Sequence, residues 1–429
     1  MLESFFSLSS GQPLFWIQKM PQISLSKFLF LFFFVSAFFL QSCKNKAVEE
    51  DYFPPARAKG GWRTNTSREF VESQGLNYDA LQELGRYGLF AVKNSCIQGY
   101  DDHNHASVLF IKNGWILGEW YLRPESRTFQ QYLSSNGKSF AYFLFGMLMK
   151  EAKSGRLQIN EFSEKSKLYN PLWMAEGYPL SDPKKAEITF EHVFQHTSGL
   201  MPEITADGTR VERGRYLWSD YGSWVVGHDP KYTVTGKLFF DPGKPEQYEG
   251  SEIWGEHRGA YSSIAFAHLG IAFHYISGQL PDTLLWQNLL KPIGFDGISY
   301  HYPPGGDYYR WFTAGGLRMT ARDYARFCYL LLKRGRWQKK HLVDEEWVDR
   351  VYDTPNYPNL RSNIDHYLSD KFPEDMLRIY GSGGNFAYII PSLDLIALHC
   401  GRCNNLWAKK LEEGFLSRML SVLGGNNKN

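Results

Sequence analysis

The spacing of apolar residues predicts a mixture of antiparallel strands and helices. In SVLFIKNGWILGEWYL, two β-rich runs flank Asn113-Gly114, a dipeptide suited to a two-residue type I′ turn, so we expect a hairpin. Near the C-terminus, MLRIYGSGGNFAYIIPSLDLIALHCGR predicts two or three strands, broken at residues 381–384 and at Pro391-Ser392. Apolar residues recur at helical spacing in residues 76–89 and in the last segment, LWAKKLEEGFLSRMLSVL, which should pack on that sheet.

Four further segments predict helices with recognisable ends. Residues 135–153 are apolar on most sides and stop at Ser154-Gly155, so this helix should be buried. Another follows Tyr261-Ser262-Ser263 and is closed by Gly278, and a third is amphipathic and capped by Thr320. ITFEHVFQHTSGL indicates a short helix that ends at its Ser-Gly pair.

The N-terminus carries a short apolar run behind basic residues. Residues 28–40 (FLFLFFFVSAFFL) are too short for a spanning helix, which needs roughly 20 residues, and instead predict the apolar region of a secretory signal. The run ends in LQSC, which resembles a bacterial lipobox and implies lipidation of Cys43. Met1 and Met20 are both possible starts, and an uncleaved anchor is the alternative. We expect an exported protein, attached by a lipid to a bacterial membrane in the periplasm or at the cell surface.

Composition sets the domain organisation. The 429 residues, 43% apolar and 21% charged, can bury a sizeable core. Residues 44–62 are charged and rich in Pro and Gly, so we expect a signal at 1–43, a tether at 44–75 and one domain at 76–425. The net charge of +2 and the absence of a basic run give no case for a nucleic-acid partner.

Two features resemble parts of metal sites, but both are incomplete. Cys400 and Cys403 have the spacing of a redox or zinc half-site, yet no second pair follows and the pair closes a strand-like run. His192 and His196 are four residues apart, without the Glu of a HExxH motif or a third ligand. We therefore expect no metal and no cofactor.

The candidate chemistry lies in Leu133-Ser134-Ser135-Asn136-Gly137-Lys138, at the start of the buried helix. Ser135 and Lys138 are three residues apart and would share a helix face. A lysine in an apolar setting loses its preference for the charged form and can act as a base, while the helix N-terminus offers N–H groups to an oxyanion. Two other Ser-x-x-Lys copies, at Ser24 and Ser181, lie in the signal and before Pro183, so only Ser135 precedes a buried helix.

On these residues the chain resembles the serine β-lactamase-related hydrolases, which include class C β-lactamases, DD-peptidases, esterases and 6-aminohexanoate-dimer hydrolases. The resemblance extends over most of residues 76–425, in five ordered blocks: NGWILGEWYL, SSNGKSF, ITFEHVFQHTSGL, AYSSIAFAHLGIAFHYISG and GGLRMTARDYARFCYLLLKRGRW. It implies an α+β fold, with an antiparallel sheet flanked by helices, a mainly helical lobe and an active site between them.

The resemblance also implies roles for matching residues. Ser135 would be the acylated nucleophile, Lys138 would help to take its proton, and Tyr261 would serve as general base and later acid. A tyrosine with an ordinary pKa of about 10 needs a nearby cation for that role, and Lys138 is one. Tyr248, in GKPEQYEG, is the competing candidate; Tyr261 is favoured because it immediately precedes the matching helix.

The third family motif departs from the pattern. Where relatives carry Lys-Thr-Gly or His-x-Gly, counting back from Pro391 gives Ile379-Tyr380-Gly381. The backbone N–H groups of Ser135 and Ser382 would then form the oxyanion hole, whereas a shifted register would use Gly383-Gly384. In neither register is a Lys or His available to hold a carboxylate. That disfavours β-lactams and D-Ala-D-Ala ends.

We therefore expect a serine hydrolase that acts through a Ser135 acyl-enzyme on a small-molecule ester or amide, or on a peptide. The alternatives are a cell-wall DD-peptidase or β-lactamase-like penicillin-binding protein, a non-catalytic binding relative and, more remotely, a metal hydrolase. Residues 201–259 form an aromatic-rich insertion that should shape the pocket, but nothing in it names a substrate.

Overall fold

The computed structural model describes most of the chain beyond residue 50. The described residues are 51–95, 104–157, 159, 161–173, 180, 182–203, 237–254, 257–300, 312–352, 364–366, 370–403 and 405–424. Residues 53–429 form one compact unit. The predicted signal, with Met20 and Cys43, lies outside the described residues. Within the described ranges, none of the helices combines the length and apolar character needed to cross a bilayer.

A six-stranded antiparallel sheet is formed by strands from both ends of the unit, in the order β10-β11-β12-β13-β1-β2. The strands are β10 (Ile364–His366), β11 (Leu377–Gly381), β12 (Asn385–Ile390), β13 (Leu395–Gly401), β1 (Ala106–Lys112) and β2 (Trp115–Tyr121). The predicted hairpin is confirmed, because Asn113 and Gly114 both have positive φ (51° and 72°), as a type I′ turn requires. Pairing of β13 with β1 places the C-terminal strands beside the hairpin.

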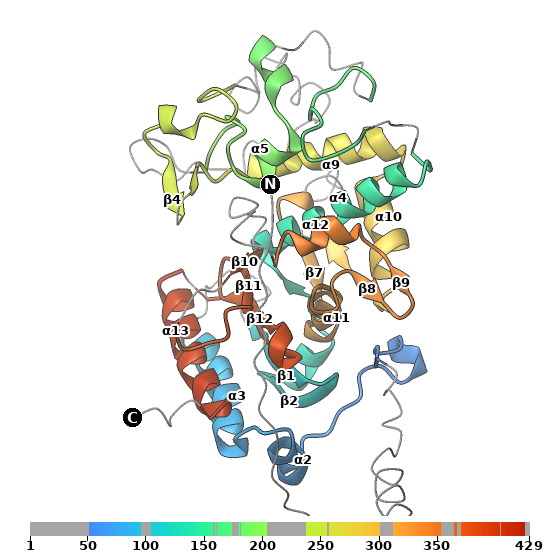
Figure 1. Cartoon of the computed structure of the whole chain (residues 1–429). Helices are drawn as coiled ribbons and strands as arrows, with labels where there is room; N and C mark the ends of the chain where they lie inside the picture. Colours follow the sequence, from blue (N-terminus) through green and yellow to red (C-terminus); the bar gives the residue numbers. More distant parts are fainter. Residues whose placement is uncertain are drawn as a thin grey trace, which may run out of the picture. The chain divides into compact units, whose positions relative to one another are not determined.

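Helices cover both faces of this sheet (Figure 1). α3 (Tyr78–Ser95) and α13 (Asn405–Val422) lie side by side on one face, and α11 (Ala321–Leu332) contacts β1, β12 and β13 from the other. The α3 and α13 face forms one apolar cluster with alternate strand residues such as Phe110 and Tyr388. The final helix therefore packs on the sheet, as its pattern predicts.

A mainly helical lobe lies beyond one end of the sheet (Figure 1). Its helices are α4 (Gly137–Lys153), α5 (Phe190–Phe194), α9 (Ser263–Ser277), α10 (Pro281–Leu285), the π-helical η9 (Trp286–Leu290) and α12 (Glu345–Asp349). Tyr142 and Trp347 stack at 4.4 Å, and each donates a hydrogen bond to the other's backbone carbonyl at 2.9 Å. Aromatic residues thus build much of this core. The α+β architecture is confirmed.

The remaining described elements are short. They are α2 (Arg68–Ser73), β3 (Gln131–Tyr132), β4 (Glu252–Trp254), β5 (His257–Gly259), β6 (Ser299–Tyr300), β7 (Leu317–Met319), β8 (Arg336–Trp337), β9 (Lys340–His341) and the single turns η1 (Arg57–Lys59), η3 (Pro124–Arg127), η4 (Ser134–Asn136), η6 (Pro183–Glu187), η8 (Pro245–Gln247) and η11 (Pro391–Leu393). Of these, η4 and the three-stranded sheet β3-β7-β6 position the candidate nucleophile.

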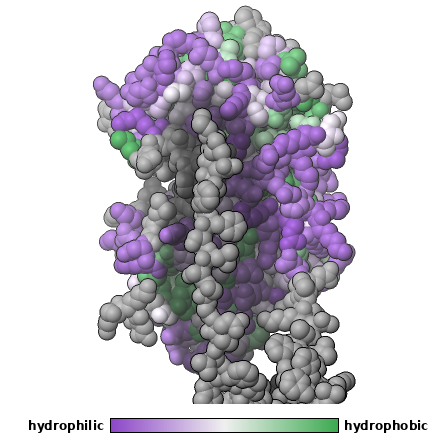
Figure 2. All heavy atoms as spheres, in the orientation of Figure 1, coloured by the Kyte–Doolittle hydropathy of each residue, from purple (hydrophilic) through white to green (hydrophobic). Residues whose placement is uncertain are grey.

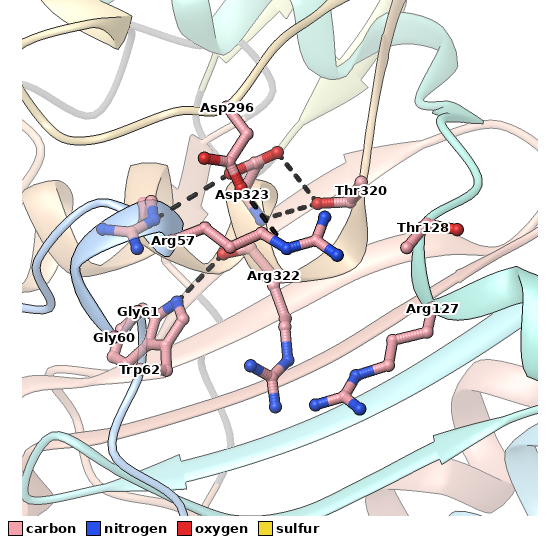
Figure 3. A pocket seen from close by; sticks show the side chains of 11 residues that line it. Arg57, Gly60, Gly61, Trp62, Arg127, Thr128, Asp296, Thr320, Arg322 and Asp323 are labelled. Atoms are coloured by element: carbon pink, nitrogen blue, oxygen red, sulfur yellow. Dashed lines mark hydrogen bonds and ion pairs between the residues drawn. The ribbon is translucent and has the colours of Figure 1, made fainter.

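Residues 53–75, which were expected to belong to the tether, pack against α11 and the sheet, and Figure 3 shows Arg57 and Trp62 beside α11. The buried Arg326 of α11 donates to the carbonyl oxygens of Pro54 (2.7 Å) and Pro55 (2.5 Å). The indole of Trp62 donates to the carbonyl of Arg322 at 3.1 Å. These residues therefore belong to the compact unit, which begins at Phe53. Their backbone carbonyls satisfy the buried guanidinium of Arg326, which would otherwise be costly to bury.

This segment also closes a cavity of about 230 Å³ at the N-terminus of α11 (Figure 3). Its charged lining is largely paired: Arg322 makes two hydrogen bonds to Glu119, and Asp323 lies 3.9 Å from Arg326. No residue that lines it belongs to the Ser135 motif. The surface visible in Figure 2 is mainly hydrophilic where it is described, with hydrophobic side chains in small separate groups.

Two buried histidines predict a loss of stability in mild acid. Burial lowers the pKa of His268 in α9 to about 3 and that of His399 in β13 to about 4, from an ordinary 6.5. Between those values and pH 6.5 the unfolded chain binds protons that the folded chain does not. The free energy of unfolding therefore falls as the pH falls through this window, by on the order of 3 kcal/mol for His399 at pH 4.

Thermal melts between pH 7.5 and 4.5 check this, with His399→Gln as the test variant and His274→Gln, near the end of α9, as the control. We expect Tm of His399→Gln to depend less on pH than that of the wild type, and His274→Gln to keep the wild-type dependence. Burial raises the pKa of Asp323 to about 6, so this group increases the free energy of unfolding as the pH falls, opposite to the histidines. Asp323 is present in all three proteins. Equal pH dependence in wild type and His399→Gln would contradict the assignment.

Candidate active site

Ser135 lies in η4, the single 3₁₀ turn that leads into α4. The predicted helix thus begins as 3₁₀ structure and becomes α-helical at Gly137, ending at Lys153 as its pattern predicts. Ser134 has a φ of 52°, which turns the chain sharply before Ser135. Gly137 has no room for a side chain, because a Cβ there would lie 2.2 Å from the carbonyl oxygen of Phe312. The turn is therefore pressed against the segment that precedes β7.

Lys138, in the first turn of α4, is fully buried. Its Nζ lies 3.3 Å from Oγ of Ser135 and donates to the carbonyl of Ala314 (2.7 Å) and to Oγ of Ser263 (3.0 Å). The same nitrogen is 4.8 Å from the ring centroid of Tyr261. The structure thus brings Ser135, Lys138 and Tyr261 together, three residues that sequence reasoning singled out.

The Tyr261-Ser262-Ser263 turn is held from two sides. The ring of His196 packs on that of Tyr261 at 4.4 Å, and its Nδ1 accepts from the backbone N–H of Ser262 at 3.2 Å. Ser262 also caps α9 and donates to the carbonyl of Met201 at 2.7 Å. Tyr248, the competing candidate, packs in a separate cluster with Phe240 and Ala260.

The glycine-ended strand β11 lies directly beside the nucleophile turn. A Cβ on Gly381 would lie 2.3 Å from the carbonyl oxygen of Leu133 and 2.9 Å from Oδ1 of Asn136. Gly383 points elsewhere: its carbonyl accepts from the backbone N–H of Cys403 at 2.9 Å. Gly381, rather than Gly383, is therefore the glycine of this hairpin that lies against the Ser135 motif, and Ser382 follows it.

Several residues of this group had no role in the sequence interpretation. Ser263 is the second residue after Tyr261 in the matching block AYSSIAFAHLGIAFHYISG, a signal that could have linked it to Lys138. Glu203, whose carboxylate accepts from Oγ of Ser263, lies in a stretch without periodicity and offered no signal. Ala314 contributes only its backbone carbonyl, which no side-chain pattern reveals.

The histidine pair and the cysteine pair that resemble parts of metal sites have structural roles or are buried. His192 completes the capping box of α5. The helix ends at Phe194, so the prediction that one helix holds both His192 and His196 is wrong. Cys400 and Cys403 are buried, and burial raises the pKa of the Cys400 thiol. Among the residues that the structure describes, no group of three or more His, Cys, Asp or Glu could hold a metal ion.

The close approach of β11 predicts that Gly381 tolerates no larger residue. In Gly381→Val, the side chain must displace Leu133 and with it the turn that carries Ser135. We expect at least a tenfold loss of kcat/KM for any reaction that uses Ser135, because small displacements of reacting groups are costly. Gly297→Val is the control, because a Cβ there would lie 3.7 Å from Nε2 of Gln130, an ordinary contact, and the φ of Gly297 is not positive. Wild-type kcat/KM in a folded Gly381→Val would contradict the assigned contact.

Comparisons with known proteins identify the family and the fold. The family model named Beta-lactamase matches residues 96–398. Among solved structures, the hydrolase EstCE1, described as having promiscuous acyltransferase activity, has a TM-score of 0.56 at 13% identity, covering 82% of this chain and 100% of its own. A class C β-lactamase from Rhodobacter sphaeroides has a TM-score of 0.51 at 14% identity, with 78% of this chain and 99% of its own covered. A proposed 6-aminohexanoate-dimer hydrolase from Bacillus anthracis has a TM-score of 0.53 at 15% identity, with 76% and 82% covered. No curated protein matches the sequence significantly.

Proposed function

Because the chain belongs to the Beta-lactamase family and has the fold of its serine hydrolases, we propose that it hydrolyses a small ester or amide through a Ser135 acyl-enzyme. The observation that carries this proposal is the 3.3 Å approach of Nζ of the buried Lys138 to Oγ of Ser135, at the N-terminus of a helix. A hydroxyl becomes an effective nucleophile when an adjacent base accepts its proton.

The proposed reaction has two half-reactions. Oγ of Ser135 attacks the acyl carbon while its proton passes to the neutral amine of Lys138, and the resulting oxyanion is held by the backbone N–H groups of Ser135 and Ser382. Collapse expels the alcohol or amine, which takes a proton from the Lys138 and Tyr261 pair. Water then attacks the acyl-enzyme and gives one proton to the same pair. As the bond between the acyl carbon and Oγ breaks, the pair returns this proton to Ser135 and the acid is released.

The chemistry of β11 favours neutral acyl groups. Its Ile379-Tyr380-Gly381 segment supplies no cation beside the nucleophile turn, which supports an esterase or small-amide hydrolase over a β-lactamase. A second candidate, a hydrolase of carboxylate-bearing substrates such as β-lactams or peptide ends, is favoured by Arg402 at the end of β13. Its guanidinium lies 5.1 Å from the ring centroid of Tyr132, three residues before Ser135.

We also propose that the protein is exported and attached to a bacterial membrane through a lipid on Cys43. The apolar run at residues 28–40 and the LQSC sequence support this proposal. Metabolic labelling with an alkyne fatty acid, compared between wild type and Cys43→Ala, tests it. Equal labelling of both proteins would overturn the assignment.

Covalent labelling tests the proposed activity. Incubation of the purified chain with a fluorophosphonate probe should add one adduct, which peptide mass spectrometry should locate on Ser135. Hydrolysis of p-nitrophenyl acetate without hydrolysis of nitrocefin would support the esterase, whereas nitrocefin turnover that is lost in Arg402→Gln would support the second candidate. A chain that neither takes the label nor hydrolyses any ester would be the non-catalytic relative, and the proposal would fail.

A further inference from the structure

A buried carboxylate lies behind the candidate base. Glu203 is 5% exposed, and its carboxylate accepts a hydrogen bond from Oγ of Ser263. Its backbone N–H donates to the carbonyl of Tyr261 at 2.8 Å. Glu203 therefore contacts both ends of the Tyr261-Ser262-Ser263 turn. Burial of a carboxylate is costly unless it is hydrogen-bonded or paired with a cation, and Ser263 connects it to Lys138.

Two of the hydrogen bonds of Lys138, to Ser263 and to Ala314, have only one possible direction. Ser263 has a single hydroxyl hydrogen, which it donates to Glu203, so its oxygen can only accept from Lys138 at 3.0 Å. The carbonyl of Ala314, at 2.7 Å, is also only an acceptor. Two of the four tetrahedral positions of Nζ are therefore N–H bonds and a third is the side-chain carbon. The remaining position is the one that can form a hydrogen bond with Oγ of Ser135.

This arrangement has a chemical consequence. In the ammonium form of Lys138 the remaining position is an N–H, and in the amine form it is the lone pair. The amine therefore directs its lone pair at Oγ of Ser135, as a base must. When it accepts the proton of Ser135, the new positive charge forms one hydroxyl away from the carboxylate of Glu203, which stabilises it.

We propose that Glu203, acting through Ser263, is a positioning residue that orients Lys138 and stabilises its protonated form. The inference rests on the proposed function, because it assigns Lys138 the role of base. The other titratable groups that face this cluster are Tyr261, whose ring lies 4.8 Å from Nζ, and His196, which packs on Tyr261. Nδ1 of His196 accepts from the Ser262 N–H, so this nitrogen carries no hydrogen.

The pH dependence of kcat/KM for ester hydrolysis tests the proposal. In Glu203→Gln the amide oxygen can still accept from Ser263, but the charge is lost. We expect the acid limb of the profile, which reports conversion of Lys138 to its amine, to move to lower pH by about one unit or more. The plateau value of kcat should fall roughly tenfold, because the ammonium formed in the reaction is less stabilised, with KM little changed.

Two further variants separate this role from a structural one. Glu164→Gln alters another buried glutamate, paired with Arg350 at 2.8 Å, and should leave the acid limb in place. In a Ser263→Ala background, Glu203→Gln should shift the limb by less than half as much as in the wild type, because the connecting hydroxyl is absent. If Glu203→Gln alone is unstable, Ser263→Ala by itself tests the connection, because loss of the hydroxyl that accepts from Lys138 should also move the acid limb to lower pH.

Fluorophosphonate labelling separates failure of this inference from failure of the proposed function. If wild type and Glu203→Gln are both labelled on Ser135 but have the same acid limb, the role of Glu203 is overturned. The proposal that Ser135 forms an acyl-enzyme is then retained. An equal shift in Glu164→Gln would also overturn it. Absence of labelling in the wild type would overturn the proposed function and this inference with it.

Discussion

Replacement of Ser135 by alanine is expected to lower kcat for ester hydrolysis by about 10⁴-fold or more, because removal of a nucleophile leaves only binding and oxyanion stabilisation. Fluorophosphonate labelling should disappear at the same time. The substitution removes one oxygen from a half-buried side chain, so Tm should change by no more than about 2 °C. Kinetics, intact-mass spectrometry and a thermal melt measure the three quantities.

Ser134→Gly is the matched control for this experiment. Ser134 is adjacent and also carries a hydroxyl, but its φ of 52° lies in the region that glycine adopts freely. The variant should keep its labelling and most of its turnover. Labelling that persists in Ser135→Ala, or that disappears only in Ser134→Gly, would refute Ser135 as the nucleophile.

Replacement of Lys138 by methionine is expected to lower kcat/KM by about 10³-fold, within the range typical of a lost general base. Methionine has a similar length and fills the space beside Phe266, but it leaves the Ala314 carbonyl and the Ser263 hydroxyl without their donor, so Tm should also fall. Ser135 should still react with the fluorophosphonate, but slowly, and its labelling rate should rise steeply with pH because hydroxide must replace the missing base.

Lys150→Met, near the other end of α4, is the control, since the ammonium of Lys150 donates to the carbonyl of His341 away from Ser135. This variant should keep its wild-type kcat/KM. If Lys138→Met retained more than a tenth of the wild-type kcat/KM, Lys138 would be excluded as the base. Tyr261 would then be the remaining candidate.

Local signals in the sequence were sufficient for most of the secondary structure. Asn113-Gly114 predicts the hairpin because a type I′ turn needs two residues that tolerate positive φ. Thr320 caps α11 by accepting from the backbone N–H of Asp323, and Gly278 ends α9 with a φ of 66°. Each of these features depends on residues within one turn of the chain, so it can be read without knowledge of the fold.

The chemistry was only partly readable in this way. Ser135 and Lys138 were found because they lie one helical turn apart and precede an apolar run. The family motif connected Tyr261 to them across more than a hundred residues, which no local pattern does. The extent of the domain at its N-terminus was less apparent, because Pro- and Gly-rich composition says nothing of the carbonyl groups that Arg326 binds.

By itself, the sequence determined the family, the hairpin, most of the helix ends and the pairing of a serine with a lysine, since each depends on neighbouring residues or an ordered set of motifs. Tertiary structure alone decided that Gly381 lies against Leu133, that His196 holds the tyrosine turn, and that Glu203 reaches Lys138 through Ser263. These contacts join segments 60 or more residues apart in the chain, and hydrogen-bond direction and steric fit exist only once the fold brings them together.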